Sequence, residues 1–576
     1  MKLFLKHIDK PLFLLILITT IGAFLRFYKL DWGNGIFTHP DEYHIIASVN
    51  QLFFPNQMHP HFFSYGTFTI YLIYLIKQIL LYLGYHIQDI NIFLIGRFCS
   101  AIFSTLTIII IYKISRFFMN QRFSLVSSLL AALTPGLIQQ AHFTTPESNL
   151  IFFMLGTILF IMYFLEYKKL YFIFTSSIFL GFSLGVKISS IVLLAPLTLS
   201  ILIYSFQHKL KPNYANIIQK KRAIIYSEII QKSIIILRIL IIIISKFIAL
   251  IIGNICIILI TFAIIAPFVF IDFQGFINNL QYEGGLAIDS IPVFYTRQFI
   301  HTLPIIFQLN KIFPYALGFP LLFLGIEGLF LSLVRINDKR YLILIISFIS
   351  IFIPNVFLFT KWTRFISPIF PFFSIFSCLF IEFIFRKNKK ISILLLIILI
   401  TTTIIWSYAF FSIYLRPDVR IVASSWLEKN LPNNSTIMIE GGNMIDIPLS
   451  GNFNRSSYDF YNFDYDKLTR MNIYKGLENS DYFIVQSRRV FLNHQRSRVY
   501  FPKTAHFYDL LFSKKLGFEE IKEFNSYPML SFNNFKIEFP DENAEETWSV
   551  FDHPVIRIFK KINHIQKEGF AKKFNE

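Results

Sequence analysis

Two adjacent carboxylates follow the first apolar run of the chain, in a segment that reads Thr-His-Pro-Asp-Glu-Tyr over residues 38–43. One carboxylate of such a pair can accept the proton of a hydroxyl group, while its neighbour orients the molecule that carries this hydroxyl. The simpler interpretation is a helix start at the water boundary, because Pro40 suits the first helical position and the helix dipole favours Asp41. On the first interpretation, Asp41 and Glu42 are the candidate catalytic residues.

Basic residues at the ends of apolar runs are candidates for holding an anionic group. They are Arg97, Lys187, Lys361 and Arg364. Arginine in particular suits phosphate, since its planar guanidinium donates two parallel, charge-assisted hydrogen bonds. The alternative is that these long side chains reach from the membrane to its aqueous surface, an arrangement that needs no ligand.

Five further polar residues lie between apolar runs and are candidates for lining the same site. They are His39, His142, Glu147, Tyr282 and Glu283. For Glu147 a structural role is the main alternative, because Thr145 can cap a helix and Pro146 suits the first helical position. The histidines do not have the spacing of a zinc protease, so polar residues at a membrane surface are favoured over a metal site.

The elements that must position these residues are membrane helices. Apolar residues make up 54% of the 576 residues and charged residues only 15%, against about one quarter charged in soluble domains. Runs such as 11–27, 225–270 and 391–411 have the length of roughly 20 apolar residues that crosses a bilayer. Backbone groups in lipid must be bonded within the protein, and these runs lack the alternation of a β-barrel. The sequence therefore predicts an all-α polytopic membrane bundle.

Several classes of function are disfavoured. The net charge of +19 does not indicate nucleic-acid binding, because the Lys and Arg residues are spread between the apolar runs as topology signals are. The three cysteines lie in separate apolar runs and predict neither disulfides nor a zinc site. The sequence has no Walker loop, dinucleotide fingerprint or nucleophile elbow, which argues against a nucleotide-driven pump.

Clusters of basic residues set the predicted topology, since such clusters favour the cytoplasmic side. An even number of spans must separate neighbouring clusters, and about eleven spans satisfy this condition if 69–84 lies in the outer interface. These spans cover residues 11–27, 92–112, 123–141, 148–166, 170–186, 189–206, 238–267, 313–334, 341–359, 365–385 and 391–411. The N-terminus is then cytoplasmic, the first helix is an uncleaved span of a plasma (inner) membrane, and the C-terminus lies outside.

This topology places the candidate residues on one side of the membrane. The outward segments are the loop 28–91 with its acidic pair, the turns 142–147 and 360–364, the loop 268–312 and the tail 412–576, whereas the basic loop 207–237 is cytoplasmic. We therefore expect a membrane domain at 1–411 and an extracytoplasmic α/β domain at 412–576. In the tail, alternation predicts strands at 436–440 and 482–486, and amphipathic spacing predicts helices at 423–430 and 508–516.

With these residues in place, the chain resembles the GT-C-fold membrane glycosyltransferases of family 39. This group includes the protein O-mannosyltransferases and the aminoarabinose transferase of lipid A, and the resemblance is to its bacterial type. The resemblance is carried by an ordered set of short motifs across about residues 20–410. They lie at 25–30, 39–42, 96–98, 132–135, 140–147, 185–187 and 364–368. The order of the set is far more specific than any one motif.

The resemblance implies an inverting glycosyltransferase that moves a sugar from a polyprenyl-phosphate donor to a hydroxyl of a cell-envelope acceptor on the outer face. Asp41 would be the general base and Glu42 its partner in binding the acceptor. Arg97, Lys187 and Arg364 would hold the donor phosphate, with Arg364 the best placed. No cofactor is required, because protein cations can stabilise the leaving phosphate, and a divalent cation is the alternative left open.

Two points concern the acceptor and the rival functions. A glycolipid or a polysaccharide precursor is favoured over a protein acceptor, because the sequence has no MIR-type domain of the eukaryotic protein mannosyltransferases. A transporter or flippase of a lipid-linked saccharide is the first alternative, but it would need charges deep within the spans, where few occur. A non-catalytic membrane scaffold is the second, and it would tolerate amide substitutions at Asp41 and Glu42.

Overall fold

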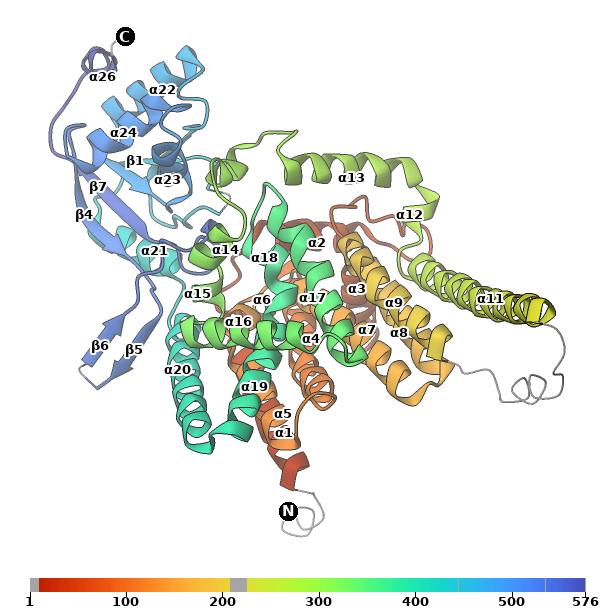
Figure 1. Ribbon diagram of the computed structural model, residues 1–576. Helices are drawn as coiled ribbons and strands as arrows, with labels where there is room; N and C mark the ends of the chain where they lie inside the picture. Colours follow the sequence, from red (N-terminus) through yellow and green to blue (C-terminus); the bar gives the residue numbers. More distant parts are fainter. Residues whose placement is uncertain (1–9, 208–224, 444, 534, 575–576) are drawn as a thin grey trace.

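The computed structural model describes residues 10–207, 225–443, 445–533 and 535–574. These residues form a bundle of helices with an α/β domain packed at one end of it (Figure 1). The helical bundle extends from the N-terminal helix to α20, and the sheet of the α/β domain is built from the tail. The predicted all-α membrane bundle with a C-terminal α/β domain is therefore confirmed.

Eight helices of the described part are long and apolar enough to cross a membrane. They are α1 (Lys10–Phe27), α4 (Asp89–Ser115), α7 (Glu147–Tyr167), η2 (Ile188–Leu193) continued by α9 (Leu194–Gln207), α11 (Ile225–Ile265), α17 (Lys339–Phe357), α18 (Thr363–Ile366) continued through η5 (Ser367–Ile369) by α19 (Phe370–Lys387), and α20 (Lys389–Leu415). A ninth span is bent by 55° between α5 (Gln121–Leu133) and α6 (Pro135–Ala141). The shorter apolar helices α8 (Leu170–Val186) and α16 (Phe319–Val334) coincide with the two remaining predicted spans.

A buried arginine satisfies the backbone at the bend between α5 and α6. Pro135 starts α6 and interrupts the helix, which leaves carbonyl groups of α5 without their usual partners. Arg26 of α1 donates to the carbonyl oxygens of Ala131 at 3.2 Å and Ala132 at 2.9 Å, and to Ser104 Oγ at 2.7 Å. Irregular backbone inside a membrane protein needs such internal partners, so Arg26 has a structural role.

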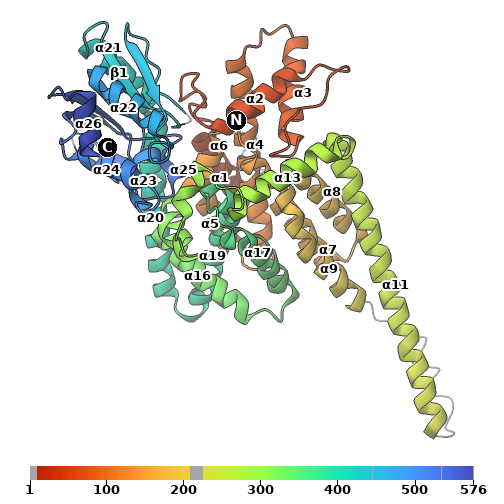
Figure 2. The same cartoon turned by 90° about the horizontal axis from the view of Figure 1, so that it is seen from above.

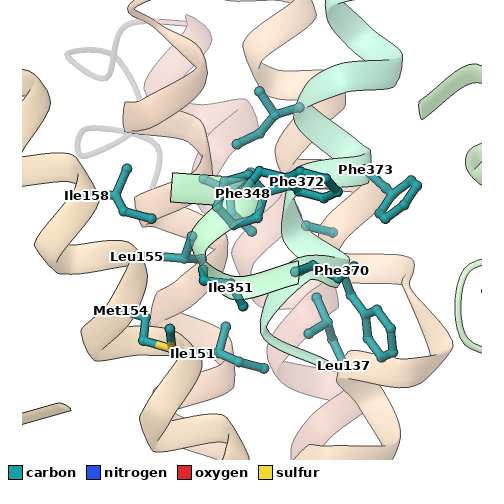
Figure 3. Packing of buried hydrophobic residues seen from close by; sticks show 14 of the residues in the cluster. Leu137, Ile151, Met154, Leu155, Ile158, Phe348, Ile351, Phe370, Phe372 and Phe373 are labelled. Carbon is teal, nitrogen blue, oxygen red and sulfur yellow. The ribbon is translucent and has the colours of Figure 1, made fainter. Parts of the chain in front are cut away.

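The bundle core is built from aliphatic and aromatic side chains of α7, α17 and α19 (Figure 3). Phe348 and Phe372 lie side by side there, with ring centroids 5.7 Å apart. Small residues allow α16 to approach α19, because a Cβ at Gly328 would lie 1.8 Å from the carbonyl oxygen of Phe376. Close approach through glycine is a common way to pack helices in membranes, where apolar burial gives no driving force between them.

Short helices cover the end of the bundle that carries the candidate residues. They are α2 (Pro40–Gln51), α3 (Phe68–Tyr82), α12 (Phe268–Ile271), α13 (Phe273–Ile288), η4 (Phe294–Phe299), α14 (Ile306–Lys311) and α15 (Phe313–Ala316). In Figure 1, α13 runs across the top of the bundle. Figure 2 shows α11 projecting away from the other helices.

One predicted loop is partly helical. Residues 225–237 belong to α11, whereas the sequence predicted a basic loop over 207–237. The apolar residues interspersed with the basic ones there allow the helix to begin before its membrane span. Residues 208–224 of this loop lie outside the described residues.

The tail contains a five-stranded mixed sheet in the order β2-β1-β3-β7-β4. The strands are β1 (Thr436–Glu440), β2 (Asn454–Tyr458), β3 (Tyr482–Val485), β4 (Phe518–Phe524) and β7 (Ile556–Lys561). Strand β1 is parallel to β2 and β3, and β7 is antiparallel to β3 and β4. The helices around it are α21 (Val419–Asn430), α22 (Lys467–Asn479), α23 (Arg489–Arg496), α24 (Pro502–Phe512), α25 (Glu546–Ser549) and α26 (Lys567–Lys573).

The predicted tail elements at 436–440, 482–486, 423–430 and 508–516 correspond to β1, β3, α21 and α24, although α24 begins and ends earlier. The hairpin β5 (Met529–Phe532) and β6 (Phe535–Glu538) leaves the sheet and packs beside α20. There Met529 N donates to Ser412 Oγ at 3.1 Å. Helix α20 continues to Leu415, so the membrane helix ends a turn later than residue 411.

Candidate active site

Helix α2 places Asp41 in its first turn. Its N-cap is His39, whose Nδ1 accepts a hydrogen bond from Asp41 N at 3.1 Å, and Pro40 occupies the first helical position. Burial lowers the pKa of His39, so the imidazole is neutral near pH 7 and its Nδ1 can accept. The helix start expected as the simpler interpretation is therefore real, and it also fixes the direction of the Asp41 carboxylate.

Asp41, Tyr65 and Arg364 form a compact cluster. Tyr65 Oη donates to Asp41 Oδ2 at 2.5 Å, and Arg364 Nη1 donates both to the same oxygen and to Tyr65 Oη, the latter at 2.9 Å. The Asp41 and Arg364 side chains are largely buried, with 14% and 20% of their surfaces exposed. Arg364 Nε is also buried but has no hydrogen-bond partner among the described residues, so the guanidinium has donor capacity left.

The surroundings keep Asp41 ionised. Burial raises the pKa of the Asp41 carboxyl, but the Arg364 guanidinium, His39 and the Tyr65 hydrogen bond together hold it below the ordinary value. Burial also raises the pKa of Tyr65 well above its ordinary value, so this phenol stays protonated and donates. The cluster therefore presents a carboxylate with one cation and one neutral donor.

A second cation, Lys187, lies beside this cluster. Its Nζ is 3.4 Å from Glu147 Oε1 and 5.5 Å from the centroid of the Tyr65 ring. Burial lowers the pKa of Lys187, while Glu147 counteracts this shift. The backbone brings these residues together, because Gly66 N donates to the carbonyl oxygen of Val186 at 2.9 Å. A Cβ at Gly66 would lie 2.0 Å from the carbonyl oxygen of Gly185, so this contact requires glycine.

A cavity of about 210 Å³ opens next to the cations, between α7, α8, α13 and α17. Its polar lining includes Tyr65, Lys187, Glu283 and Arg364. The rest of its wall is mostly apolar and includes Leu150, Met154, Leu184, Val192, Phe262 and Ile351. Such a cavity can hold an anionic head group at one end and a hydrocarbon chain at the other.

Glu42 and Arg97, predicted to bind the acceptor and the donor phosphate, form a separate buried pair in the structure. Arg97 Nε lies 2.8 Å from Glu42 Oε1, and its Nη2 lies 3.0 Å from Glu42 Oε2. Arg97 also donates to Thr38 Oγ1 and to the carbonyl oxygen of Leu30, while Glu42 accepts from Thr144 N. Both side chains are 0% exposed, so Glu42 does not face an acceptor and Arg97 does not face the cavity.

Three further predicted residues lie away from the cavity. Lys361 is buried and donates to the carbonyl oxygen of Phe359 at 2.9 Å, so it is not placed to hold phosphate. The His142 ring stacks on Tyr414 at 3.8 Å, deep in the bundle. Tyr282 is 46% exposed on α13, whereas its neighbour Glu283 lines the cavity. Lys361, His142 and Tyr282 therefore lie outside the lining of the cavity, and their predicted roles at the site stay predictions.

The sequence reasoning missed Tyr65. The available signal was its place in the predicted outer loop 28–91, directly before Gly66, but nothing local indicates that its hydroxyl meets Asp41. The described residues contain no group of three His, Cys, Asp or Glu side chains that could hold a metal ion.

Comparisons with known proteins bear on the fold. Residues 69–219 match the family model described as dolichyl-phosphate-mannose-protein mannosyltransferase. No curated protein sequence matches the chain. The Archaeoglobus fulgidus oligosaccharyltransferase tethered with an acceptor peptide is a similar solved structure, at 14% identity and a TM-score of 0.50, and the match covers 86% of this chain and 72% of that chain.

Two further solved structures are similar at lower TM-scores. The oligosaccharyltransferase AglB from Archaeoglobus fulgidus, in complex with an inhibitory peptide and a dolichol-phosphate, matches at 12% identity and a TM-score of 0.49, over 97% of this chain and 77% of that chain. ArnT from Cupriavidus metallidurans, bound to undecaprenyl phosphate, matches at 12% identity and a TM-score of 0.46, over 84% of this chain and 94% of that chain. The family-model match and the shared fold confirm the GT-C resemblance, and the chain is a multi-pass membrane protein.

Proposed function

We propose that the chain is an inverting glycosyltransferase that moves a sugar from a polyprenyl-phosphate donor to a hydroxyl of a cell-envelope acceptor. The observation that carries this proposal is the Asp41 carboxylate paired with Arg364, which together with Lys187 lines the polar end of an apolar cavity. A base, two cations and a hydrocarbon-lined space are what such a reaction needs in one place.

The donor phosphate is assigned to Arg364 and Lys187. The free Nε of Arg364 and the ammonium of Lys187 border the same cavity, and both can donate charge-assisted hydrogen bonds to phosphate oxygens. The apolar wall then accommodates the first units of the prenyl chain. The family-model match supports this donor class, because residues 69–219 include Lys187 and the family is described by a dolichyl-phosphate sugar.

The reaction is a displacement at the anomeric carbon. The acceptor hydroxyl oxygen forms a bond to this carbon as the bond to the phosphate oxygen breaks, and the polyprenyl phosphate leaves with the electron pair. Asp41 accepts the hydroxyl proton, which becomes more acidic as the new bond forms, so a carboxylate with a low pKa suffices as base. Arg364 and Lys187 stabilise the negative charge that grows on the leaving phosphate.

A metal is not required on this proposal, because the two cations lie where the leaving charge develops. A divalent cation that bound through Asp41 or Glu147 would compete with Arg364 and Lys187 for these carboxylates. We propose that the site lies on the outer face of a plasma membrane, with the N-terminus cytoplasmic and the tail outside. A glycolipid or polysaccharide precursor is the proposed acceptor class, and a protein is the alternative.

The test compares purified wild type with Asp41→Asn and with Tyr282→Phe as a control outside the cavity. Each is incubated with polyprenyl-phosphate sugars and membrane extract, and released polyprenyl phosphate and transferred sugar are measured. Transfer by wild type and Tyr282→Phe that Asp41→Asn abolishes would support the base assignment. Transfer that survives in Asp41→Asn would remove Asp41 as the base. Movement of the intact donor between vesicle leaflets without hydrolysis or transfer would favour a flippase.

A further inference from the structure

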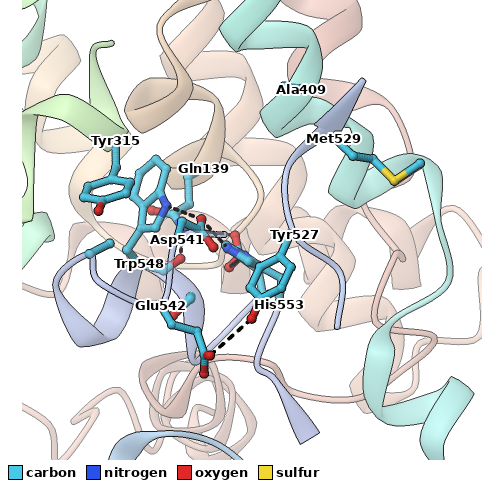
Figure 4. Close-up of polar contacts among 12 residues, drawn as sticks. Gln139, Tyr315, Ala409, Tyr527, Met529, Asp541, Glu542, Trp548 and His553 are labelled. Carbon is cyan, nitrogen blue, oxygen red and sulfur yellow. Dashed lines mark hydrogen bonds and ion pairs between the residues drawn. The ribbon is translucent and has the colours of Figure 1, made fainter. Parts of the chain in front are cut away.

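Residues 541–553 of the tail, which we call the junction segment, lie between the tail sheet and the membrane helices. Figure 4 shows Asp541, Trp548 and His553 of this segment beside Gln139 of α6. The segment is buried on both sides, with exposures of 1% for Trp548 and 0% for His553. A surface linker would not be enclosed in this way, so the segment is part of the interface that holds the tail to the bundle.

A network of side chains fixes the junction segment. Asp541 Oδ2 accepts from Trp548 Nε1 at 2.9 Å and pairs with His553 Nε2 at 2.8 Å, and His553 Nδ1 pairs with Asp552 Oδ1 at 2.5 Å. Burial lowers the pKa of His553, but the two carboxylates raise it to about 10, so the imidazole is charged. Gln139 Nε2 donates to the carbonyl oxygen of Trp548 at 2.8 Å and to Asp552 Oδ2 at 3.0 Å, which ties the network to α6.

One side chain of the segment reaches the turn that carries Arg364. Glu545 Oε2 accepts from Thr363 N at 3.1 Å and from Thr363 Oγ1 at 2.9 Å. Helix α18 has no cap from its own N-cap residue, Trp362, so Glu545 supplies the missing acceptor from the tail. Thr363 directly precedes Arg364, so the orientation of Thr363 fixes the backbone position from which the Arg364 side chain extends.

Another side chain of the segment reaches the helix start that carries Asp41. The Phe551 ring lies 4.3 Å from the His39 ring, measured between centroids. His39 is the N-cap of α2 and accepts from Asp41 N, so the position of its ring and the direction of Asp41 are linked. One short piece of the tail therefore contacts both sides of the Asp41–Arg364 pair.

We propose that the junction segment positions the catalytic site, with Glu545 setting Arg364 and Phe551 setting Asp41. Each residue acts through a neighbour of the site, Glu545 through Thr363 and Phe551 through His39, so both are positioning residues rather than catalytic ones. The kinetic consequences of this inference rest on the proposed function. Its structural consequence, that the junction segment holds residues 39–43 and 360–368 in place, does not. It gives the tail a role in the reaction, because loss of the Glu545 contact weakens the hold on the donor phosphate.

The chain offers a matched control in the next residue. Glu546 is also a buried carboxylate, 4% exposed against 1% for Glu545. Its oxygens pair with Arg489 Nε at 2.5 Å and Asn493 Nδ2 at 2.9 Å, both within the tail. Glu546→Ala therefore removes a buried, bonded carboxylate from the same segment without touching the turn that carries Arg364.

The experiment uses the full chain in nanodiscs and compares wild type, Glu545→Ala, Glu545→Gln, Phe551→Leu and Glu546→Ala. Hydrogen exchange is followed in peptides that cover 360–368 and 39–43, with thermal stability measured in parallel. Glu545→Ala is expected to speed exchange in 360–368, and Phe551→Leu in 39–43, while Glu546→Ala leaves exchange in 360–368 unchanged. Glu545→Gln keeps an acceptor oxygen for Thr363 and is expected to restore slow exchange.

The same variants are titrated with undecaprenyl phosphate and assayed for transfer. Glu545→Ala is expected to weaken donor binding and to raise the KM for the donor about tenfold, the usual effect of disturbing a charge-assisted contact. Glu545→Gln is expected to restore donor binding and the KM of wild type. Glu545→Ala and Glu546→Ala could instead lose donor affinity and transfer equally, in proportion to their loss of thermal stability. This result would show that the segment is merely structural and would overturn the inference. Absence of binding and transfer in wild type would instead overturn the proposed function, and the exchange data would still decide the positioning role.

Discussion

Asp41 and Arg364 meet in the folded chain although 323 positions separate them, and both bond the hydroxyl of Tyr65. The carboxylate comes from the first turn of α2, and the guanidinium from the short helix α18 before the core helix α19. The contact therefore joins the segment between α1 and α4 to one of the last membrane helices of the chain. It also links the group that would accept a proton to the group that would hold a phosphate.

The shared hydroxyl of Tyr65 predicts a measurable role for this residue. Tyr65→Phe removes a donor to Asp41 and an acceptor for Arg364 but keeps the ring against Lys187. We expect kcat to fall about 10- to 150-fold, because a hydrogen bond to a charged group contributes about 1.5 to 3 kcal/mol. The measurement is the rate of steady-state transfer. The control is Tyr71→Phe, a tyrosine six residues further on, in α3. An unchanged kcat would show that Arg364 alone orients the carboxylate.

The two cavity cations predict a selective effect on the donor. We expect Arg364→Gln and Lys187→Gln each to raise the Kd for undecaprenyl phosphate by about tenfold or more, since each removes a charge-assisted contact. Lys361→Gln, a nearby lysine bonded to Phe359, should leave the Kd unchanged. The titration is run on protein in nanodiscs, with folding checked by thermal unfolding. A larger loss of donor affinity in Lys361→Gln than in Lys187→Gln would reverse the assignment of the phosphate site.

The electrostatics of the site predict the pH dependence of transfer. Asp41 is active when ionised, and its pKa lies below the ordinary 3.8, so activity should not fall through this group between about pH 5 and 7. Lys187 is active when charged, and burial lowers its pKa below 10.5, so donor binding should be lost on the alkaline side earlier than for an exposed lysine. Lys187→Arg should move this alkaline loss of donor binding, the alkaline limb of the pH profile, to higher pH. An alkaline limb that stays in place in Lys187→Arg would assign it to another group.

The buried Glu42–Arg97 pair predicts a loss of stability rather than of chemistry. Glu42→Gln leaves a buried guanidinium without its counter-charge, which costs about 3 to 5 kcal/mol. We expect a lower thermal unfolding temperature in Glu42→Gln and partial recovery in the double variant with Arg97→Met. Glu283→Gln, at the cavity wall, is the control and should unfold as wild type. Normal stability of Glu42→Gln with lost transfer would restore Glu42 as a catalytic residue.

A buried carboxyl in the tail predicts a pH-dependent stability there. Burial raises the pKa of Glu440 to about 7, although Tyr508 and Asn443 donate to it. The folded state then holds a proton that the unfolded state releases, so stability should fall as pH rises from about 4.5 to about 7, by on the order of 3 kcal/mol. Glu440→Gln should abolish this slope in thermal unfolding of the tail. Persistence of the slope in Glu440→Gln would place its origin in another group.

Some features of the structure follow from the sequence alone. The length and apolar character of the runs determine the membrane helices, because backbone in lipid has to bond internally whatever the tertiary arrangement. Local alternation gave β1 and β3, and capping chemistry gave the helix start at Pro40. Asp41 could be proposed as a catalytic residue because it sits in a short local motif between a helix end and a helix start.

Tertiary structure decided which of the candidates work together. Asp41 and Glu42 are neighbours in the chain, but successive residues of a helix point about 100° apart, so one meets Arg364 and the other meets Arg97. The partners of Tyr65 and Glu545 lie on distant segments, so only the packed helices bring these residues to the site. Sequence patterns record which groups must be buried or exposed, whereas the pairing of buried charges depends on how the helices cross.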